Sequence, residues 1–393
     1  MAIKIQNLRR LYEAAQRDGQ PERFEADLQE ALANRQLRFS DFSIRGLFEN
    51  FVPNGREIVD SYNPRNAGSM NLQETANVVA SSQFSKISGQ LLYTTVMEAY
   101  QDEAFVFTPL VRTIPTQFNG ERIPGISNLG DEALVVDEAQ PYPRAGVSQT
   151  YVDTPTTTKR GLIVEVTKEA LFFDRTGVLE ERCRRVGQSL GLSKEKRIID
   201  AVVDENVTDH RYNYRGNVIQ TYGDNSGTHN WDNLAATNGL VDWTDVDAAE
   251  QLLAAITDPE TGEPIILTPR HIVVTRQLLY TARRVVNATE ITVTTPGYAT
   301  SGTPTDTKVA NPVQNYAIVS SQLLAARMAT DTSWFLGDLQ RAFAYMENWP
   351  LTVVQAPANS EAEFNLDVVM RFKASERGAA ATLEPRAMVK CTA

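Results

Sequence analysis

The residues most able to do chemistry are few, and their spacing matches no catalytic or metal-binding pattern. The three histidines, His210, His229 and His271, lie outside the HExxH, HxH and Cys-His arrangements of metal sites. The two cysteines, Cys183 and Cys391, are far apart in the sequence and indicate neither a disulfide framework nor a metal-ligand pair. Glycine-rich phosphate loops and a GxSxG elbow are also absent. We therefore predict no catalytic residue, no metal ion and no cofactor, and expect a protein that is not an enzyme.

Composition narrows the class of protein further. A length of 393 residues with 42% apolar residues predicts two or three domains with substantial cores. The sequence has no apolar run long enough to span a membrane, and its first residues, MAIKIQNLRRLYEAAQRDGQ, are too polar for a signal peptide. The net charge of −11, without long basic runs, argues against tight binding of nucleic acid through neutralised phosphates. An acidic protein can still enclose DNA.

The stretch from Gly161 to Asn206 predicts a strand followed by a long helix against which the other layers of the fold can pack. Its first residues alternate as in a strand, and Thr167 can cap a short helical turn after it. From Thr176 a long helix is predicted, with Gly187 allowing the close approach of another element. Its apolar stripe comprises Leu179, Cys183, Val186, Leu190, Ile198 and Val202, and its charged face is expected to include Glu181, Arg185, Lys194 and Glu195. A long core helix of an ordinary enzyme would show the same pattern.

Residues 117–166 form a different kind of segment, rich in glycine, proline and β-branched residues. These residue types predict a long two-stranded hairpin that turns near Gln140 to Gly146. Its apolar content is too low for a core of its own, and an isolated hairpin is marginally stable in water. The hairpin therefore needs a partner surface, unless it is the lid of an active site.

The remaining segments provide the layers around the long helix. Residues 1–51 predict three short amphipathic helices, 52–75 an extended connector and 83–103 a further helix. A mixed α/β region follows. It is expected to have a helix capped by Thr244 and Asp247, strands at 264–267 and 271–274, a helix capped by Thr275, a loop at 292–312 and a strand at 316–319. Strands are predicted near the C-terminus at 334–339, 350–354, 364–372 and 387–391.

Several of these segments, in this order, resemble the major capsid proteins of tailed phages. The resemblance rests on ALVVDEAQPYPRAGV, TTTKRGLIVEVTKEALFFD and GVLEERCRRVGQSLG, followed by WFLGDLQRAFAYMENWPLTVV and FNLDVVMRFKASERGAAATLEPRAMVKC. It implies the α+β Hong Kong 97-type capsid fold. The implied parts are an N-terminal arm (1–116), an extended hairpin loop (117–166), a spine helix (167–208) and closing strands (333–393) of a peripheral domain, and an axial domain (209–332).

The same resemblance implies the function and the partners. We expect a structural protein of the virion, assembled in the host cytoplasm as hexamers and pentamers of an icosahedral head that encloses double-stranded DNA. Portal, scaffolding and decoration proteins would be further partners, and no membrane is involved. The alternatives are an encapsulin-like compartment shell and an unrecognised α+β enzyme. Contacts between subunits are expected at Arg122, Asp131, Glu132, Glu138, Arg144 and Arg160, and through the N-terminal helices at Leu28 and Phe48.

Two further expectations concern how the shell is held together. We expect the helices of residues 1–51 to remain in the mature shell and to pack on neighbouring subunits. We also expect no covalent links between subunits, because some relatives use a hairpin lysine for an isopeptide bond and this hairpin has no lysine from Gln117 to Thr158. Lys159 lies at its base, where it should be solvated or paired, and arginine is no nucleophile at neutral pH.

Overall fold

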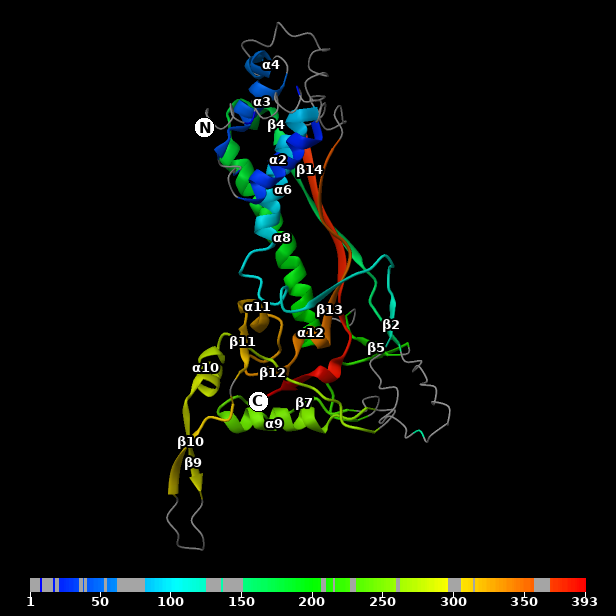
Figure 1. Cartoon of the computed structure of the whole chain (residues 1–393), viewed down its shortest axis with the longest axis vertical. Coiled ribbons are helices and arrows are strands. Elements are labelled where there is room, and N and C mark those ends of the chain that lie inside the picture. The colour runs from blue at the N-terminus through cyan, green and yellow to red at the C-terminus, as the bar shows by residue number, and fades with distance from the viewer. Residues whose placement is uncertain are drawn as a thin grey trace. The chain divides into compact units, whose positions relative to one another are not determined.

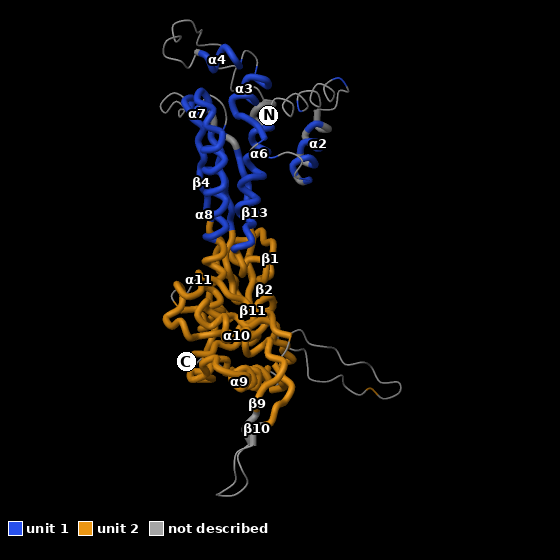
Figure 2. Tube along the Cα trace, turned by 90° about the vertical axis from the view of Figure 1, so that its left-hand side faces the viewer, with its two compact units in different colours: residues 1–104, 159–193, 349–377 blue, residues 105–158, 194–348, 378–393 orange. Residues whose placement is uncertain are grey.

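The computed structural model divides into two compact units, which are described separately (Figures 1 and 2). Unit 1 consists of residues 1–104, 159–193 and 349–377, and unit 2 of residues 105–158, 194–348 and 378–393. The structure describes residues 8, 17, 21–34, 38, 41–52, 55–61, 82–124, 136, 151–205, 210–214, 216–226, 231–258, 262–295, 305–313, 315–356 and 368–393.

Short helices of the N-terminal region form much of unit 1. They are α2 (Pro21–Ala33), α3 (Ile44–Phe51), α4 (Gly55–Ser61) and α6 (Ser82–Tyr100). Ser43 caps α3 because its hydroxyl accepts a hydrogen bond from the Gly46 backbone N–H. The helix α4 lies within the predicted connector, so that prediction was wrong for these residues. Ile58 and Val59 explain the helix, because they are buried among polar neighbours.

The spine helix was predicted correctly from its periodicity. It is α8 (Thr176–Val203), preceded by the short α7 (Lys168–Phe172), and Thr167 caps α7 as expected. Most of the predicted stripe, including Cys183 and Leu190, is buried. A Cβ atom on Gly187 would lie 2.3 Å from the Val96 carbonyl oxygen of α6, so the glycine allows direct contact between the two helices.

Two long strands belong to a four-stranded sheet. The order in this sheet is β1 (Arg112–Pro115), β13 (Phe343–Gln355), β14 (Val368–Thr382) and β4 (Thr158–Thr167), and β1 pairs with β13 in parallel. The strand β14 extends ten residues beyond the predicted end at Phe372. Its continuation contains small buried residues such as Ala380 and Ala381, which carry little strand propensity of their own. Residues 364–367 of the predicted strand lie outside the described residues.

Unit 2 is built on a five-stranded mixed sheet. Its order is β11 (Ala317–Ser320), β8 (His271–Val274), β12 (Trp334–Gly337), β15 (Met388–Cys391) and β7 (Leu234–Ala235). On one face, Ile272 and Trp334 belong to a core that includes the buried sides of α9 (Trp243–Ala255) and α10 (Leu279–Asn287). On the other face, Val273 and Phe335 share a core with residues 198–203 of α8. Burial on both faces explains why these strands are continuously apolar.

Smaller elements complete unit 2. The short helices are α11 (Gln322–Ala325), α12 (Leu339–Ala342) and the 3₁₀ turn η2 (Pro385–Ala387). A second antiparallel sheet has the order β2 (Arg122–Pro124), β3 (Tyr151–Asp153), β5 (Tyr212–Tyr214) and β6 (Asn217–Ile219). The strands β9 (Glu290–Thr295) and β10 (Thr305–Ala310) form an antiparallel ribbon in what was predicted to be a loop.

Other local predictions for unit 2 were also wrong. The capping box of α9 is formed by Asp242 and Asp245, not by Thr244 and Asp247. Residues 264–267 form no strand and contribute only an isolated bridge from Pro264 to Thr257. The Thr275 hydroxyl donates to the Asp331 carbonyl oxygen and does not cap α10, whose N-cap is Leu278. In each case a tertiary contact or a nearby competing side chain decides the local geometry.

The element order is the one expected for a Hong Kong 97-type α+β fold: N-terminal helices, hairpin strands, spine helix, mixed α/β region and closing strands. The grouping of the closing strands differs from the expectation. The strands β12 and β15 join β8, β11 and β7 in one sheet, although the first two were assigned to the peripheral domain and the others to the axial domain. The division into named domains remains a prediction.

Candidate assembly interface

The base of the predicted hairpin is an antiparallel pair in unit 2, with Arg122 opposite Asp153 and Pro124 opposite Tyr151. The Arg122 Nε atom lies 3.0 Å from Asp153 Oδ1, and the guanidinium lies 4.5 Å from the centre of the Tyr151 ring. The Arg122 side chain is 70% exposed, so this ion pair adds little to stability. Its effect is to orient a guanidinium that remains accessible to solvent.

A network of hydrogen bonds fixes the chain next to this strand pair. Thr116 donates to Glu121 Oε2 at 2.7 Å, and the Glu121 backbone N–H donates to Thr154 Oγ1 at 2.7 Å. Thr157 donates through its backbone N–H and its hydroxyl to Asn119 Oδ1. Gly120 has φ +93°, a conformation that L side chains rarely adopt. The base of the predicted hairpin is therefore held by side-chain hydrogen bonds.

A buried carboxylate holds the segment that leads to β1. Glu195 is fully buried and accepts hydrogen bonds from the Phe107 N–H at 2.7 Å, the Thr108 N–H at 2.8 Å and the Thr108 hydroxyl at 2.6 Å. Glu195 and Lys194 were predicted to lie on the charged, solvent-facing side of the spine helix, and this prediction was wrong, because both are buried. The signal was present in the sequence, because Glu195 is spaced at three to four residues from the buried Ile198 and Ile199.

Arg160 lies on β4 in unit 1, in a run of exposed residues from Thr158 to Ile163. Lys159, the residue before it, places its Nζ atom 5.6 Å from the centre of the Trp349 ring. Further along β4, Glu165 pairs with Arg371 at 2.8 Å. Arg160 is thus accessible on a strand whose neighbours are fixed by ionic and cation–π contacts.

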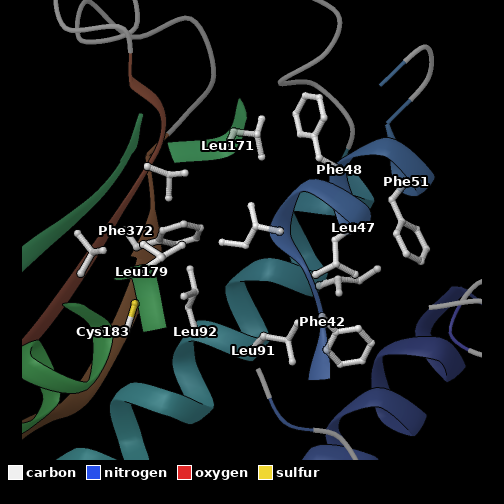
Figure 3. Close-up of a cluster of buried hydrophobic side chains, with 14 of the residues drawn as sticks. Phe42, Leu47, Phe48, Phe51, Leu91, Leu92, Leu171, Leu179, Cys183 and Phe372 are labelled. Carbon is white, nitrogen blue, oxygen red and sulfur yellow. The ribbon is translucent and has the colours of Figure 1, made fainter. Parts of the chain in front are cut away.

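The two apolar candidates, Leu28 and Phe48, lie in the core of unit 1. They are 4% and 1% exposed, and Phe48 belongs to a cluster with Phe42, Leu91 and Leu92 (Figure 3). The N-terminal helices thus dock on their own chain. A direct contact of these two side chains with a neighbour remains a prediction, and the burial leaves them little surface for it.

Polar contacts add to the docking of α3. Asp174, in the turn between α7 and α8, accepts a hydrogen bond from the Ser43 hydroxyl at 2.7 Å. The Ile44 backbone N–H donates to Thr176 Oγ1 at 2.9 Å. Arg45 pairs with Glu49 at 2.7 Å and with Asp60 at 3.4 Å. Sequence periodicity could not indicate the contacts with Asp174 and Thr176, because each joins segments that are distant in the chain.

The other candidates, Asp131, Glu132, Glu138 and Arg144, lie outside the described residues, as does the predicted turn of the hairpin. The structure therefore brings Arg122 to the base of the hairpin and Arg160 to the surface of β4.

The buried carboxylate of Asp204 in unit 2 has two cationic or titratable partners, His210 and Arg211. His210 is buried and lies 3.1 Å from Asp204 Oδ1, which also accepts from Arg211 Nε at 2.8 Å. Burial lowers the pKa of His271 on β8, which makes the imidazole neutral at neutral pH, and His229 is outside the described residues. Within the described ranges, no group of His, Cys, Asp or Glu is placed to hold a metal ion.

Burial also governs the two thiols. It raises the pKa of both Cys183 and Cys391 to about 12, so neither is an activated nucleophile. Among the helices that the structure describes, none is long and apolar enough to cross a membrane.

Comparison with known proteins identifies a family for the chain. A family model for phage capsid proteins matches residues 151–391. No curated protein matches the chain. Among solved structures, a chain of Mycobacterium phage Adephagia is 11% identical with a TM-score of 0.43, covering 73% of this chain and 89% of that chain. A capsid chain of an empty GTA particle is 11% identical with a TM-score of 0.42, covering 74% and 90%. A virus-like particle from Pyrococcus furiosus is 9% identical with a TM-score of 0.40, covering 77% and 98%.

The family assignment rests on the family model. The matched residues extend from β3 through the spine helix and the five-stranded sheet to β15, which is more than half of the chain. Because the match covers this much of the chain, the chain belongs to the phage capsid protein family.

Proposed function

We propose that this chain is a major capsid protein that self-assembles as hexamers and pentamers into an icosahedral head enclosing double-stranded DNA. The observation that carries the proposal is the family match over residues 151–391. It is supported by a hairpin whose base is held by hydrogen bonds but whose sequence is too polar for a core of its own. Such a segment gains stability by packing on another subunit. The role is structural and non-enzymatic, and the location is the capsid of the virion.

Electron microscopy of the purified protein tests this proposal directly. We expect closed icosahedral shells whose capsomers have six-fold and five-fold symmetry. A protein that remains monomeric or dimeric at every concentration would contradict the proposal. Shells that contain a host enzyme instead of DNA would favour a compartment protein of the encapsulin type.

Arg122 and Arg160 are the candidate contacts that the structure leaves accessible. We propose that Arg122 binds a carboxylate of a neighbouring subunit, in addition to its intrachain partner Asp153. Arg122→Asp should then reduce the yield of shells. The double variant Arg122→Asp with Asp153→Arg restores an ion pair within the chain and serves as the matched control. If the double variant assembles like the wild type, the pair acts only within the chain.

The N-terminal helices require a different test from simple deletion. Removing residues 2–51 would also remove Leu28, Phe48 and their neighbours from the core of unit 1, and the truncated chain would be destabilised for that reason alone. The exposed side of α2 offers Asp27 and Glu30. If this side packs on a neighbour, charge reversal at both residues lowers the shell yield while the melting temperature of the unassembled chain is unchanged.

We further propose that the head encloses DNA without binding it tightly, since the chain has a net charge of −11. Assembly takes place in the host cytoplasm, with portal, scaffolding and decoration proteins as partners. The subunits are held by non-covalent contacts alone. Mature particles boiled in denaturant and reductant should run as one band near 43.6 kDa, and a ladder of covalent oligomers would overturn this part of the proposal.

A further inference from the structure

A polar cavity of about 120 Å³ lies in unit 2. Three charged side chains line it, namely Arg270, Asp338 and Arg341, together with Leu253, Leu267, Thr268, Pro269 and Ala387. A cavity of only about 10 to 15 Å³ is enough to hold a single buried water molecule. The cavity therefore has room for a polyatomic ion or for the end of a polar side chain.

The two guanidinium groups are only partly used by the protein. Arg341 donates through Nη1 to the Ile266 carbonyl oxygen at 3.1 Å, and Arg270 Nε lies 3.6 Å from Asp338 Oδ2, too far for a strong hydrogen bond. Among the described residues, these are the only polar contacts of the two side chains. A guanidinium has five N–H donors, so most of the donors on both groups are available to a ligand.

The charge balance of the cavity favours an anion. Two guanidinium groups face one carboxylate, which gives a net positive site on a chain whose total charge is −11. His271, the next residue after Arg270, adds no positive charge at neutral pH, because burial lowers its pKa. Asp338 is held in place by the Gln340 backbone N–H, which donates to its Oδ1 atom at 3.0 Å. Arginine forks bind two oxygen atoms of one carboxylate or phosphate group.

We propose that this cavity is a binding site for an oxyanion of the carboxylate or phosphate class, held by Arg270 and Arg341. This site does not depend on the proposed shell function. Two sources can supply such a group: free phosphate in solution, or the carboxylate of an Asp or Glu side chain on a neighbouring copy of the chain.

The first experiment measures binding of inorganic phosphate to the purified protein by calorimetry in a phosphate-free buffer of low ionic strength. We expect saturable binding with one site per chain, and at least a tenfold weaker affinity in Arg341→Gln. Arg276→Gln, which removes an exposed arginine outside the cavity, should bind like the wild type. Asp338→Asn removes the opposing negative charge and should bind phosphate several-fold more tightly, a gain that misfolding cannot produce.

The second experiment separates the two sources. If the natural occupant is a carboxylate of a neighbouring copy, Arg341→Gln lowers the yield of shells and millimolar phosphate competes with assembly of the wild type. If the occupant is a free anion, phosphate binds but neither the variant nor added phosphate changes the yield. The inference is overturned if phosphate does not bind and Arg341→Gln assembles like Arg276→Gln. If neither the wild type nor any variant forms shells, the proposed function is wrong. The phosphate-binding measurements then test this site by themselves.

Discussion

The carboxylate of Glu195 offers the sharpest test of how the spine helix holds the chain. It is fully buried, and it accepts hydrogen bonds from two backbone N–H groups and one hydroxyl of Phe107 and Thr108. A hydrogen bond to a charged group contributes about 1.5 to 3 kcal/mol. Three such bonds to one carboxylate are not additive, because water can reach the part-buried Thr108 after substitution. We therefore expect Glu195→Ala to lower the free energy of unfolding by about 3 to 5 kcal/mol.

Two variants refine this expectation. Glu195→Gln keeps one acceptor oxygen and should cost about 1.5 to 3 kcal/mol. Glu181→Ala is the matched control on the same helix, because its ion pair with Arg185 is exposed and should contribute less than about 1 kcal/mol.

Chemical denaturation of the unassembled chain gives the free energies, and hydrogen exchange gives the local readout. The amides of Phe107 and Thr108 should lose protection in Glu195→Gln, while amides of the five-stranded sheet keep theirs. The reasoning is refuted if Glu195→Ala is as stable as Glu181→Ala, or if the two amides exchange at the wild-type rate.

Three more predictions follow from buried contacts. Gly187→Ala should destabilise the protein by about 1 to 3 kcal/mol in thermal unfolding, because its Cβ would lie 2.3 Å from the Val96 carbonyl oxygen. Gly177→Ala is the control. It has nothing within 4 Å of its Cβ and should be neutral or stabilising in the same assay. Burial raises the pKa of Asp204, but hydrogen bonds from His210, the Thr221 N–H and Arg211 outweigh it and hold the pKa below the ordinary 3.8. The contribution of Asp204 to stability is therefore fully present above pH 3.8 and is lost as the pH falls through the lower pKa of the folded protein. We expect Asp204→Asn to flatten the acid limb of the pH–stability curve. An unchanged limb would count against this network. Cys183 and Cys391, with pKa values near 12, should react with a thiol reagent only after unfolding, and rapid labelling of the native protein would contradict their burial.

Periodicity in the sequence was sufficient to predict the amphipathic spine helix, because the spacing of apolar residues along a helix is a local property. The spine helix followed from the spacing of Leu179, Cys183 and Leu190, and the cap at Thr167 followed from its residue type. The order of segments predicted the capsid fold, and the match to the phage capsid family confirmed the family. The spine helix and the Thr167 cap could be read directly because each depends on residues close together in the chain.

Tertiary structure alone decided the features that depend on partners far away in sequence. Phe107 and Thr108 supply the donors that satisfy the buried Glu195, and β14 continues through small residues because neighbouring strands supply its hydrogen bonds. The ribbon of β9 and β10 forms from a Thr-rich stretch whose alternation is weak, and Arg270 and Arg341 meet at one cavity although they are distant in the chain. A side chain's environment is set by groups that folding brings to it, and composition and spacing carry no record of where those groups arrive.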